Sequence, residues 1–448
     1  MELYFSDKII NLAEILGGKL YAVGGYVRNF LIDGSFSEDI DLAAPIGADT
    51  LMSALDKAGL KVVADYKRTG TVVFSDGERK YEFTSFRKDV GYTGGAHTPE
   101  KVVFTDDILK DALRRDFKCN AVYYDIKNGN TVDPLGGAED IKNRVIDTVT
   151  SPEKVFCHDG LRLMRLARFS AELNFKPKSE VLAAAKKFAA NVRDVSPERI
   201  FSELKLILKA DKKYPFSDKD GHYTGLKILD DARILDYFIP ELTAGRGMVQ
   251  RADYHDHDVL EHSLRCVRYA KEKVRLFALL HDVGKPASMQ KYGRYHYHAD
   301  EGYILAETVL KRLRADVKTI KESKFIAKYH MFDLSGNVRE NKVRIFIVKH
   351  LEYIDDLLSV MQADFSACKD DLSTSPVVEK WRGIIKKMNF EGAPRTLSDL
   401  AISGNDLLAL GINGKAVGET LSKLFLHCVI NPKDNVKEKL VKLAFLAK

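Results

Sequence analysis

Segments with strand character are confined to the first 140 residues or so, and this limits the fold more than any other feature. There, short runs rich in β-branched and aromatic residues alternate with helical stretches. These runs are KLYAVGG, DIDLAA, GTVVFS, KYEFTSFR and CNAVYYDI. From about residue 150 onward almost every segment has a helical pattern, with Ser-Pro helix starts at Ser151 and Ser196. We therefore predict an α+β protein, with a small mixed α/β head followed by a long all-helical body.

A chain of 448 residues is too long for one ordinary hydrophobic core, so several domains are expected. Gly- and Asp-rich stretches interrupt the helical pattern at several points. We predict a head over 1–145, a helical neck over 146–225, a second helical domain over 226–370 and a helical tail over 371–448.

Composition indicates a cytoplasmic protein without a membrane partner. No stretch approaches the roughly 20 uninterrupted apolar residues of a membrane helix, and the N-terminus carries acids where a signal peptide would be basic. The five cysteines form no CxxC pair, which predicts free thiols in a reducing compartment.

The stretch GGYVRNFLIDGSFSEDIDL contains two aspartates, Asp39 and Asp41, at strand spacing. Alternate strand residues face the same side, so the two carboxylates project together and favour a divalent cation such as Mg²⁺. Upstream, Gly24 and Gly25 open a helix whose free N–H groups form an anion site. A third acid from an adjacent strand is expected, and Glu82 in KYEFTSF has the right alternation. This pattern predicts metal-dependent chemistry on a nucleoside triphosphate.

The neck and the end of the head are rich in arginine. Residues 154–213 contain fourteen Lys/Arg and seven Asp/Glu, and LRLMRLARF places Arg162, Arg165 and Arg168 along one side of a predicted helix. These arginines form either a solvated basic face or a surface for a polyanion. Arg115 and Asp116 likewise form either an exposed helix end or a site for phosphates and a ribose hydroxyl.

Five motifs together resemble a known family. GGYVRNFLIDGSFSEDIDL, RRDFKCNAVYYD, DPLGGAEDIKNRVI, DGLRLMRLARFSAELNF and SPERIFSEL are similar, in order and spacing, to the motifs of class II tRNA nucleotidyltransferases (CCA-adding enzymes) and bacterial poly(A) polymerases. The resemblance implies that Asp39 and Asp41 hold two catalytic Mg²⁺ ions, with Glu82 as third acid, and that CTP, ATP and tRNA are bound. The implied nucleotide-binding residues are Gly24, Gly25, Arg28, Arg115, Asp116, Asn120, Asp159, Arg162 and Arg165. Arg168 is implied to bind RNA.

The resemblance also implies how the nucleotide is chosen. Asp159 and Arg162 match the family's nucleotide-selecting acid and arginine, and we expect their i, i+3 spacing to place both on one helix face. A carboxylate accepts from the exocyclic amine of C or A, and a guanidinium donates to the adjacent ring nitrogen. The alternative, which the residues favour without the family context, is an i, i+3 salt bridge on the surface.

Several positions depart from the family pattern. Asn29 stands where Asp is usual, Lys118-Cys119 replaces Thr-Ile, and His158 stands where an acid is common. The segment 87–107 resembles the loop that family members need to add the terminal A, which favours CCA or A addition.

The second helical domain contains His262, His281-Asp282, His298, His330 and Asp364, each from a different predicted helix. Imidazoles and carboxylates in this order suit a hydrolase centre with a mid-row metal. With Gly284-Lys285 they resemble the HD phosphohydrolase superfamily, which implies an HD domain holding Ni²⁺, Mn²⁺, Co²⁺ or Fe. We interpret His255, His257 and His296 as bystanders.

The tail contains two amphipathic helices joined by a Gly-Ile-Asn-Gly-Lys turn. Gly411 and Gly414 allow backbone N–H groups to meet a phosphate, and Lys415 adds charge, although a helical hairpin with glycine caps explains the turn equally well. A similar segment closes many bacterial tRNA nucleotidyltransferases and favours tRNA.

Three functions follow. The first is a CCA-adding tRNA nucleotidyltransferase with an HD phosphohydrolase that acts as a phosphatase or 2′,3′-cyclic phosphodiesterase. The second is a poly(A) polymerase or an enzyme that adds only part of CCA. The third is an HD phosphohydrolase whose head only binds RNA. The oligomeric state stays open.

Overall fold

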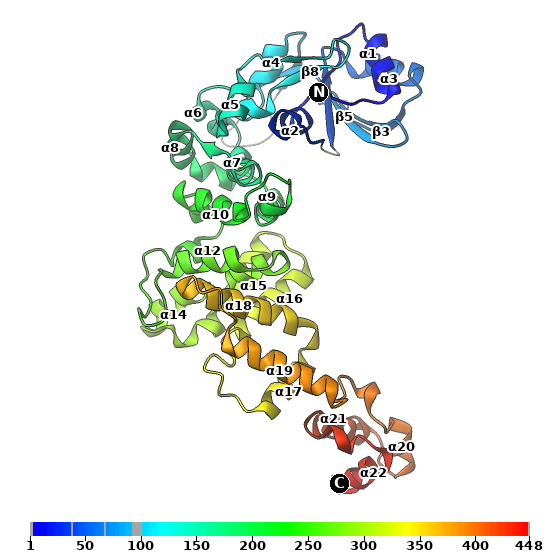
Figure 1. Ribbon diagram of the computed structural model, residues 1–448, viewed down its shortest axis with the longest axis vertical. Coiled ribbons are helices and arrows are strands. Elements are labelled where there is room, and N and C mark those ends of the chain that lie inside the picture. The colour runs from blue at the N-terminus through cyan, green and yellow to red at the C-terminus, as the bar shows by residue number, and fades with distance from the viewer. Residues whose placement is uncertain (1–2, 37–38, 67–68, 92–100, 447–448) are drawn as a thin grey trace. The chain divides into compact units, whose positions relative to one another are not determined.

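The computed structural model describes residues 3–36, 39–66, 69–91 and 101–446. The chain divides into two compact units, one made of 1–243 with 312–314 and the other of 244–311 with 315–448 (Figure 1). The predicted boundary at 225/226 falls inside helix α10 (Gly221–Asp231), which belongs to the first unit.

The head is built on a seven-stranded sheet with strand order β3-β4-β5-β2-β1-β8-β9. Only β2 and β5 pair in parallel, and every other neighbouring pair is antiparallel. Alternate residues of β4 and β5 are buried, as the sequence pattern predicts for strands packed on one face. The strands are β1 (Tyr21–Val23), β2 (Ile40–Ala44), β3 (Lys61–Tyr66), β4 (Thr71–Ser75), β5 (Lys80–Ser85), β8 (Tyr123–Asp125) and β9 (Asn130–Val132).

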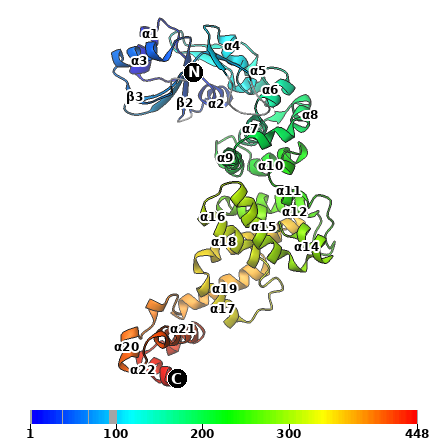
Figure 2. The ribbon, with the colours of Figure 1, turned by 180° about the vertical axis from the view of Figure 1, so that it is seen from behind.

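Helices and a separate hairpin complete the head (Figure 2). The hairpin pairs β6 (Arg87–Val90) with β7 (Lys101–Phe104). Both strands belong to the segment 87–107, which is predicted to be a loop, and the part between them, 92–100, lies outside the described residues. The helices are α1 (Asp7–Ile15), α2 (Gly25–Asp33), α3 (Ala48–Lys57), α4 (Ile108–Leu113) and α5 (Gly137–Asn143).

The neck is helical around α7 (Leu161–Leu173), which is almost wholly buried and contacts α9 (Pro197–Ile207) and α10. Its other helices are α6 (Pro152–His158), α8 (Ser179–Lys187) and α11 (Pro240–Thr243). A short parallel pair, β10 (Val145–Ile146) with β11 (Lys176–Pro177), adds strand structure after residue 150 that the sequence did not predict.

The helical pattern that follows Ser151 is interrupted once in the neck. SPEKVFCHDGLRLMRLARFSAEL is not one helix, because α6 ends at His158, Asp159 is extended and α7 begins at Leu161. Gly160 lies in the break, where a Cβ would be only 2.1 Å from the carbonyl oxygen of Asn191. The close approach of the chain at 191 therefore requires glycine at this position.

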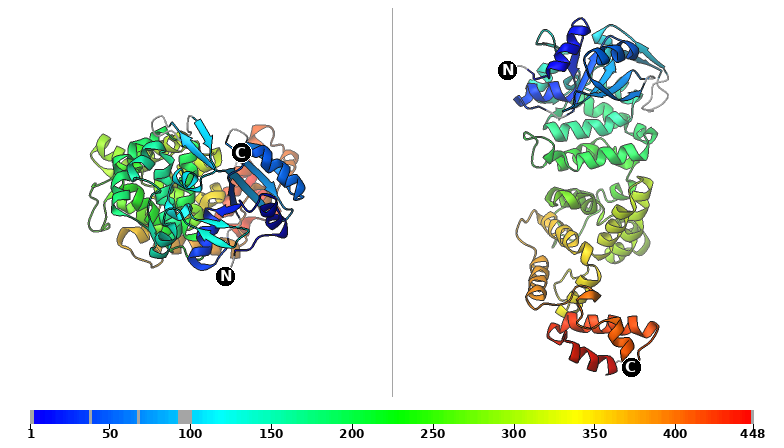
Figure 3. Two further views of the ribbon diagram at one scale, coloured as in Figure 1. Left: turned by 90° about the horizontal axis from the view of Figure 1, so that it is seen from above. Right: turned by 90° about the vertical axis from the view of Figure 1, so that its right-hand side faces the viewer.

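The second unit is entirely helical over the residues described (Figure 3). Helix α12 (Val259–Tyr269) packs along α18 (Ile354–Lys369), and both contact α13 (Arg275–Leu280). The remaining helices of this part are α14 (Lys285–Tyr292), α15 (His298–Arg312), α16 (Val317–Tyr329), α17 (Glu340–Lys349) and α19 (Pro376–Phe390).

The C-terminal helices α20 (Gly404–Ala409), α21 (Lys415–Ile430) and α22 (Lys437–Leu446) share a small apolar core of their own, around Leu407, Leu424 and Leu440. All five cysteines are free thiols. Among the described helices, none combines the length and apolar character needed to cross a bilayer.

Candidate active site and metal centre

The acids of the head lie on neighbouring strands. Asp41 on β2 and Glu82 on β5 are direct partners in the parallel pair, and Asp39 comes just before β2. Gly24 faces the same point, because a Cβ there would lie 2.8 Å from Oδ2 of Asp41. Its φ of 77° also favours glycine. The strand pairing thus brings three carboxylates and a glycine turn to one position.

The electrostatics of this position fit a divalent cation. Burial raises the pKa of Asp41 to about 6, Glu82 and Asp39 add to the rise, and Arg115 and Arg165 oppose it. Burial and the neighbouring acids disfavour the ionised form of Asp41. A cation bound between these carboxylates would stabilise that ionised form. Carboxylate oxygens are ligands that Mg²⁺ prefers, so Asp39, Asp41 and Glu82 form a suitable set of donors.

Helix α2 begins at Gly25, and its N-cap residue Gly24 provides no side-chain cap. Its Arg28 is 2% exposed and held in place from two sides. Oδ1 of Asn29 accepts from Nε at 3.2 Å and from a terminal nitrogen at 2.9 Å, while Oδ1 of Asn120 accepts from the other terminal nitrogen at 2.6 Å. Asn29 therefore orients Arg28 by the same two bonds that a carboxylate would accept.

The RRDF motif continues this network. Asn120 donates to Oδ1 of Asp116 at 3.2 Å, and Arg165 of the neck donates to Oδ2 of Asp116 at 2.6 Å. Burial alone would raise the pKa of Asp116, but Arg165 and Arg162 outweigh it and hold the pKa at about 2. Asp116 is thus a fixed negative charge that joins the head to the arginines of the neck.

Arg115 is oriented by residues that the sequence did not single out. Its guanidinium lies 3.2 Å from Oδ2 of the fully buried Asp111 and donates to the hydroxyl of Tyr123 at 3.1 Å. Tyr123 in turn donates to Oδ2 of Asp111 at 2.7 Å. The i, i+4 spacing of Asp111 and Arg115 was a signal available in the sequence.

The neck contributes to the same site. Nε of Arg162 lies 3.7 Å from Oδ2 of Asp159, and Oδ1 of Asp159 accepts from the backbone N–H of Leu161 at 2.9 Å. The two side chains meet, but not on one helix face as predicted, because Asp159 precedes α7. Arg168 lies 2.8 Å from Glu203. The arginines of α7 are thus partly buried beside carboxylates, which excludes the alternative of a freely solvated face.

One cavity of about 1070 Å³ unites these groups. Every site residue predicted in the head and neck lines it: Gly24, Gly25, Arg28, Asp39, Asp41, Glu82, Arg115, Asp116, Asn120, Asp159, Arg162, Arg165 and Arg168. Tyr214, whose hydroxyl accepts a hydrogen bond from Arg28 at 3.1 Å, also lines the cavity. It lies in a stretch that the sequence pattern marks only as a break between domains.

The remaining departures from the family pattern lie outside this cavity. Lys118 forms an ion pair with Asp147 at 2.6 Å, which Lys178 shares at 2.8 Å. Cys119 is fully buried, and burial raises its pKa to about 12. His158 is the last residue of α6 and does not line the cavity.

In the second unit, the predicted HD ligands converge from five helices or their ends. Oδ1 of Asp364 lies 2.9 Å from Nε2 of His262 and 3.5 Å from Nε2 of His281. Asp282 faces both halves of the set: Oδ2 is 3.3 Å from Nε2 of His281, and Oδ1 is 3.4 Å from Nε2 of both His298 and His330. Asp282 therefore belongs to two groups of possible metal ligands, one with His262 and His281 and one with His298 and His330.

Several of these atoms are available to bind a metal ion. Nε2 of His262, Nε2 of His281 and Oδ1 of Asp282 are buried and make no hydrogen bond within the described residues. Burial would raise the pKa of Asp282, but Lys285, whose Nζ lies 2.5 Å from Oδ2, and His281 hold that pKa well below its usual range. Buried imidazole nitrogens beside ionised carboxylates are a suitable donor set for a mid-row divalent metal.

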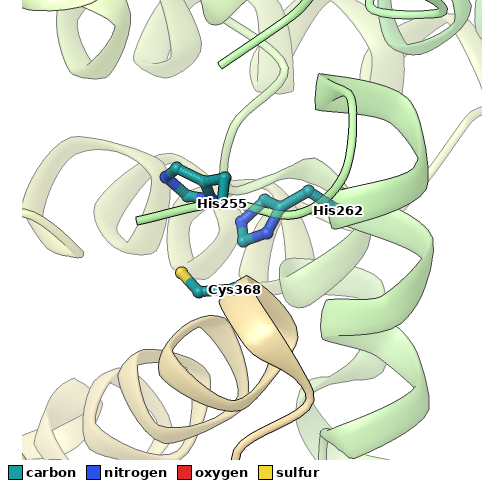
Figure 4. A group of neighbouring side chains, drawn as sticks. All are labelled: His255, His262 and Cys368. Carbon is teal, nitrogen blue, oxygen red and sulfur yellow. The ribbon is translucent and has the colours of Figure 1, made fainter. Parts of the chain in front are cut away.

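His255 lies closer to this centre than a bystander would. Its ring contacts that of His262 at 4.9 Å between centroids, and one ligand atom each of His255, His262 and Cys368 lie within 4.8 Å of one another (Figure 4). Among the described residues, His257 and His296 belong to no such group.

In the tail, Gly411 and Gly414 have positive φ, at 78° and 59°, and α21 begins directly at Lys415 without a side-chain cap. Lys415 is exposed and lies 3.6 Å from Glu419. The turn is thus open to solvent.

The head fold, its acid-bearing cavity and the histidine cluster define a nucleotidyltransferase with an attached HD domain. Residues 20–147 match the Poly A polymerase head domain, 174–245 match the "Probable RNA and SrmB- binding site of polymerase A", and 259–357 match the HD domain. The A-adding tRNA nucleotidyltransferase of Deinococcus radiodurans is 30% identical over 428 residues, which cover 90% of this chain and 89% of the relative. The chain belongs to the family of class II tRNA nucleotidyltransferases and bacterial poly(A) polymerases.

Two further relatives support the match over nearly the whole length. The CCA-adding enzyme of Bacillus pumilus is 28% identical over 438 residues, covering 94% of this chain and 92% of the relative. The crystal structure of the Bacillus stearothermophilus CCA-adding enzyme in complex with CTP superposes with a TM-score of 0.67 at 22% identity, covering 99% and 98% of the two chains. This structural likeness shows the shared fold.

Proposed function

We propose that the protein transfers CMP and AMP from CTP and ATP to the 3′ end of tRNA without a nucleic-acid template. The observation that carries this proposal is the single cavity in which the acids Asp39, Asp41 and Glu82 share walls with Asp159 and Arg162. Such a cavity combines a place for phosphoryl transfer with a place to read the edge of a base.

The residues of the head would bind and orient the triphosphate. Asp39 and Asp41, with Glu82, would hold Mg²⁺, which supplies activation of the primer hydroxyl and charge stabilisation of the leaving pyrophosphate. The first N–H groups of α2, left uncapped behind Gly24 and Gly25, would donate to phosphate oxygens. Arg115, fixed by Asp111 and Tyr123, would add positive charge beside them.

The neck would select the base. Asp159 is fixed by its bond to the Leu161 N–H, so its carboxylate accepts from the exocyclic amine of C or A at a defined place. Arg162, whose guanidinium also donates to the carbonyl of Arg114 at 2.6 Å, would donate to the adjacent ring nitrogen. U and G present the wrong groups to this pair, so side chains alone would discriminate.

The relatives point to two products: one is an A-adding enzyme, which implies a single added A, and another is a CCA-adding enzyme, which implies the whole CCA end. The experiment offers tRNA transcripts that lack CCA, end in CC or are complete, each with single labelled nucleotides. Addition of two C and one A, then arrest, would support the proposal. Extension only of the CC-ended transcript would make it an A-adding enzyme, and A-runs on unrelated RNA would make it a poly(A) polymerase.

The second unit supports a second activity, metal-dependent hydrolysis of phosphate esters. The specific observation is the convergence of the six predicted ligands, of which His262, His281 and Asp282 each have a buried atom without a hydrogen-bond partner among the described residues. Purified protein with Ni²⁺, Mn²⁺ or Co²⁺ is expected to hydrolyse p-nitrophenyl phosphate or 2′,3′-cAMP, and His281→Ala to abolish this while sparing nucleotide addition. If neither ester were hydrolysed with any of the three metals, the proposal of a hydrolase would be wrong.

The tail would bind the sugar-phosphate backbone of tRNA through the turn at Gly411, Gly414 and Lys415. Because these residues are exposed, Lys415→Glu should weaken tRNA binding at low salt without lowering stability. Unchanged tRNA affinity in a gel-shift titration would contradict the role.

A further inference from the structure

The four HD histidines are not held alike. Nδ1 of His281, His298 and His330 each donates to a backbone carbonyl three residues earlier, at 2.7, 2.7 and 3.0 Å. This bond fixes the tautomer and leaves Nε2 for a metal. Nδ1 of His262 is buried but has no hydrogen-bond partner among the residues described, although the whole side chain is 0% exposed.

Two neighbours of His262 outside the HD set, His255 and Cys368, could ligate a metal with it (Figure 4). His255 lies in the segment before α12, and its buried Nδ1 also lacks a partner in the described part of the chain. Cys368 follows Asp364 by one turn of α18. The carbonyl of Cys368 accepts from the backbone N–H of Asp256 at 3.0 Å, which ties the segment containing His255 to the end of α18.

We propose that His255, His262 and Cys368 form a third metal position beside the two HD positions. Nε2 of His262 faces Asp364 and Asp282, so the ring would use Nδ1 for the third position and bridge it to the HD centre. The arrangement shares His262 with the proposed HD site, but it concerns metal binding alone and holds whether or not that site hydrolyses an ester.

The donor atoms indicate which metal this position takes. The HD set contains only nitrogen and oxygen donors, whereas the third group adds a thiol sulfur. Thiolate with imidazole suits Zn²⁺ or Co²⁺ and does not suit Mg²⁺. When the metal binds, the sulfur of Cys368 donates a lone pair to it and the thiol proton leaves to solvent. If the ring of His262 binds metals through both nitrogens, its remaining N–H proton also leaves to solvent.

Cobalt provides a direct test, because a thiolate ligand gives Co²⁺ a near-ultraviolet charge-transfer band that nitrogen and oxygen ligands do not give. Metal-free full-length protein is titrated with Co²⁺, desalted and analysed for bound metal. We expect the band in the wild type, and we expect Cys368→Ser and His255→Ala to abolish it and to retain one metal equivalent fewer than the wild type.

Three variants serve as controls. Cys157→Ser removes an exposed cysteine of the first unit, and His257→Ala removes a histidine two residues from His255 that faces Asp370 at 3.8 Å. Both should keep the band. His281→Ala removes a ligand of the HD positions only, so it should lose metal and hydrolysis yet keep the band. This separates failure of the HD proposal from failure of the third position.

Two results would overturn the inference. One is a wild-type protein without the charge-transfer band at saturating Co²⁺. The other is a band of equal intensity in Cys368→Ser, which would assign it to another cysteine such as the buried Cys266 near His281. Thermal unfolding of each metal-free variant identifies any that fails to fold, and for His255 the conservative variant His255→Gln then replaces His255→Ala.

Discussion

The two acid-bearing sites differ in how much of each is complete before a substrate arrives. In the head, Asp39 and Glu82 are exposed and Asp41 is half-buried at the wall of a wide cavity. In the HD centre, His262 and His281 are 0% exposed and Asp282 is 2% exposed. Buried ligands on packed helices form a metal site by themselves, whereas the open carboxylates of the head depend on a triphosphate to complete the coordination.

The charges around the two sites also differ. The cavity of the head contains several arginines, and many of them are paired with buried carboxylates such as Asp111 and Asp116. The HD carboxylate Asp282 has one lysine, Lys285. The head therefore positions cations for phosphates, and the HD centre concentrates anions for a metal.

The largest expected effect is on the catalytic acids of the head. Asp41→Ala should lower nucleotide addition at least about a thousandfold, because metal-assisted charge stabilisation supplies several kcal/mol of the barrier. Addition is measured by primer extension on tRNA, with the exposed Asp49→Ala as the matched control. Metal bound by the second unit should not change. If the variant kept a tenth of the wild-type rate, Asp41 would not be a catalytic metal ligand.

Metal removal should separate the two units. A chelator should destabilise the HD helices by about 4 kcal/mol relative to protein holding a metal at a thousand times its Kd, while leaving the head unchanged. Without the ion, the buried carboxylate of Asp282 and the half-buried carboxylate of Asp364 have Lys285 as a nearby cation. Hydrogen exchange of α12 and α18, compared with β2 and β5, measures the difference. Equal effects on both units would contradict a metal site that is complete only in the HD centre.

Base selection tests whether the neck is as preorganised as the HD centre. Asp159→Ala should reduce the preference for CTP and ATP over UTP about tenfold to a hundredfold, as expected when a polar partner of the base is removed. Asp159→Asn keeps an acceptor for the Leu161 N–H and should therefore keep the start of α7. If both variants retained full selectivity in single-nucleotide incorporation, the choice would lie elsewhere in the cavity.

The sequence predicted the elements that follow from periodicity. The alternation in β2 and β5 placed Asp41 and Glu82 on one side of a sheet, and their parallel pairing brought them together. The helical pattern after 150 was confirmed, and the HD ligands could be found because each lies on a buried helix face or helix end.

Long-range contacts account for what the sequence did not predict. The break at Asp159 arises where Gly160 meets the chain at 191, and no local pattern records that approach. Tyr214 enters the cavity only because its segment packs against Arg28, 186 positions away in the chain. His255 and Cys368 meet through a bond between a loop and the end of a distant helix.

The ion network behind Arg115 should appear in the pH dependence of stability. Burial would raise the pKa of Asp111, but Arg115 and Arg114 lower it to about 2. A depressed carboxyl pKa stabilises the fold above the unfolded value near 4 and loses this contribution as the pH falls toward 2. Asp111→Asn should thus remove about 2 kcal/mol at pH 6 and less at pH 3. Chemical unfolding of the head at both pH values, with the exposed Asp106→Asn as control, measures this, and equal losses at both pH values would contradict it.

The smallest expected effect concerns Asn29, where the chain departs from its family. Asn29→Asp keeps an oxygen for both bonds from Arg28 and adds a negative charge next to that guanidinium. If Arg28 acts on the triphosphate through its charge, KM for ATP and CTP should rise about threefold, which is less than 1 kcal/mol, with kcat unchanged.

Asn29→Ala provides the matched comparison, because it removes both bonds without adding charge and should lower stability by about 1–3 kcal/mol. An Asn29→Asp variant with unchanged KM would mean that Asn29 only orients Arg28. A raised KM would show instead that the buried Arg28 contributes to triphosphate binding through its charge.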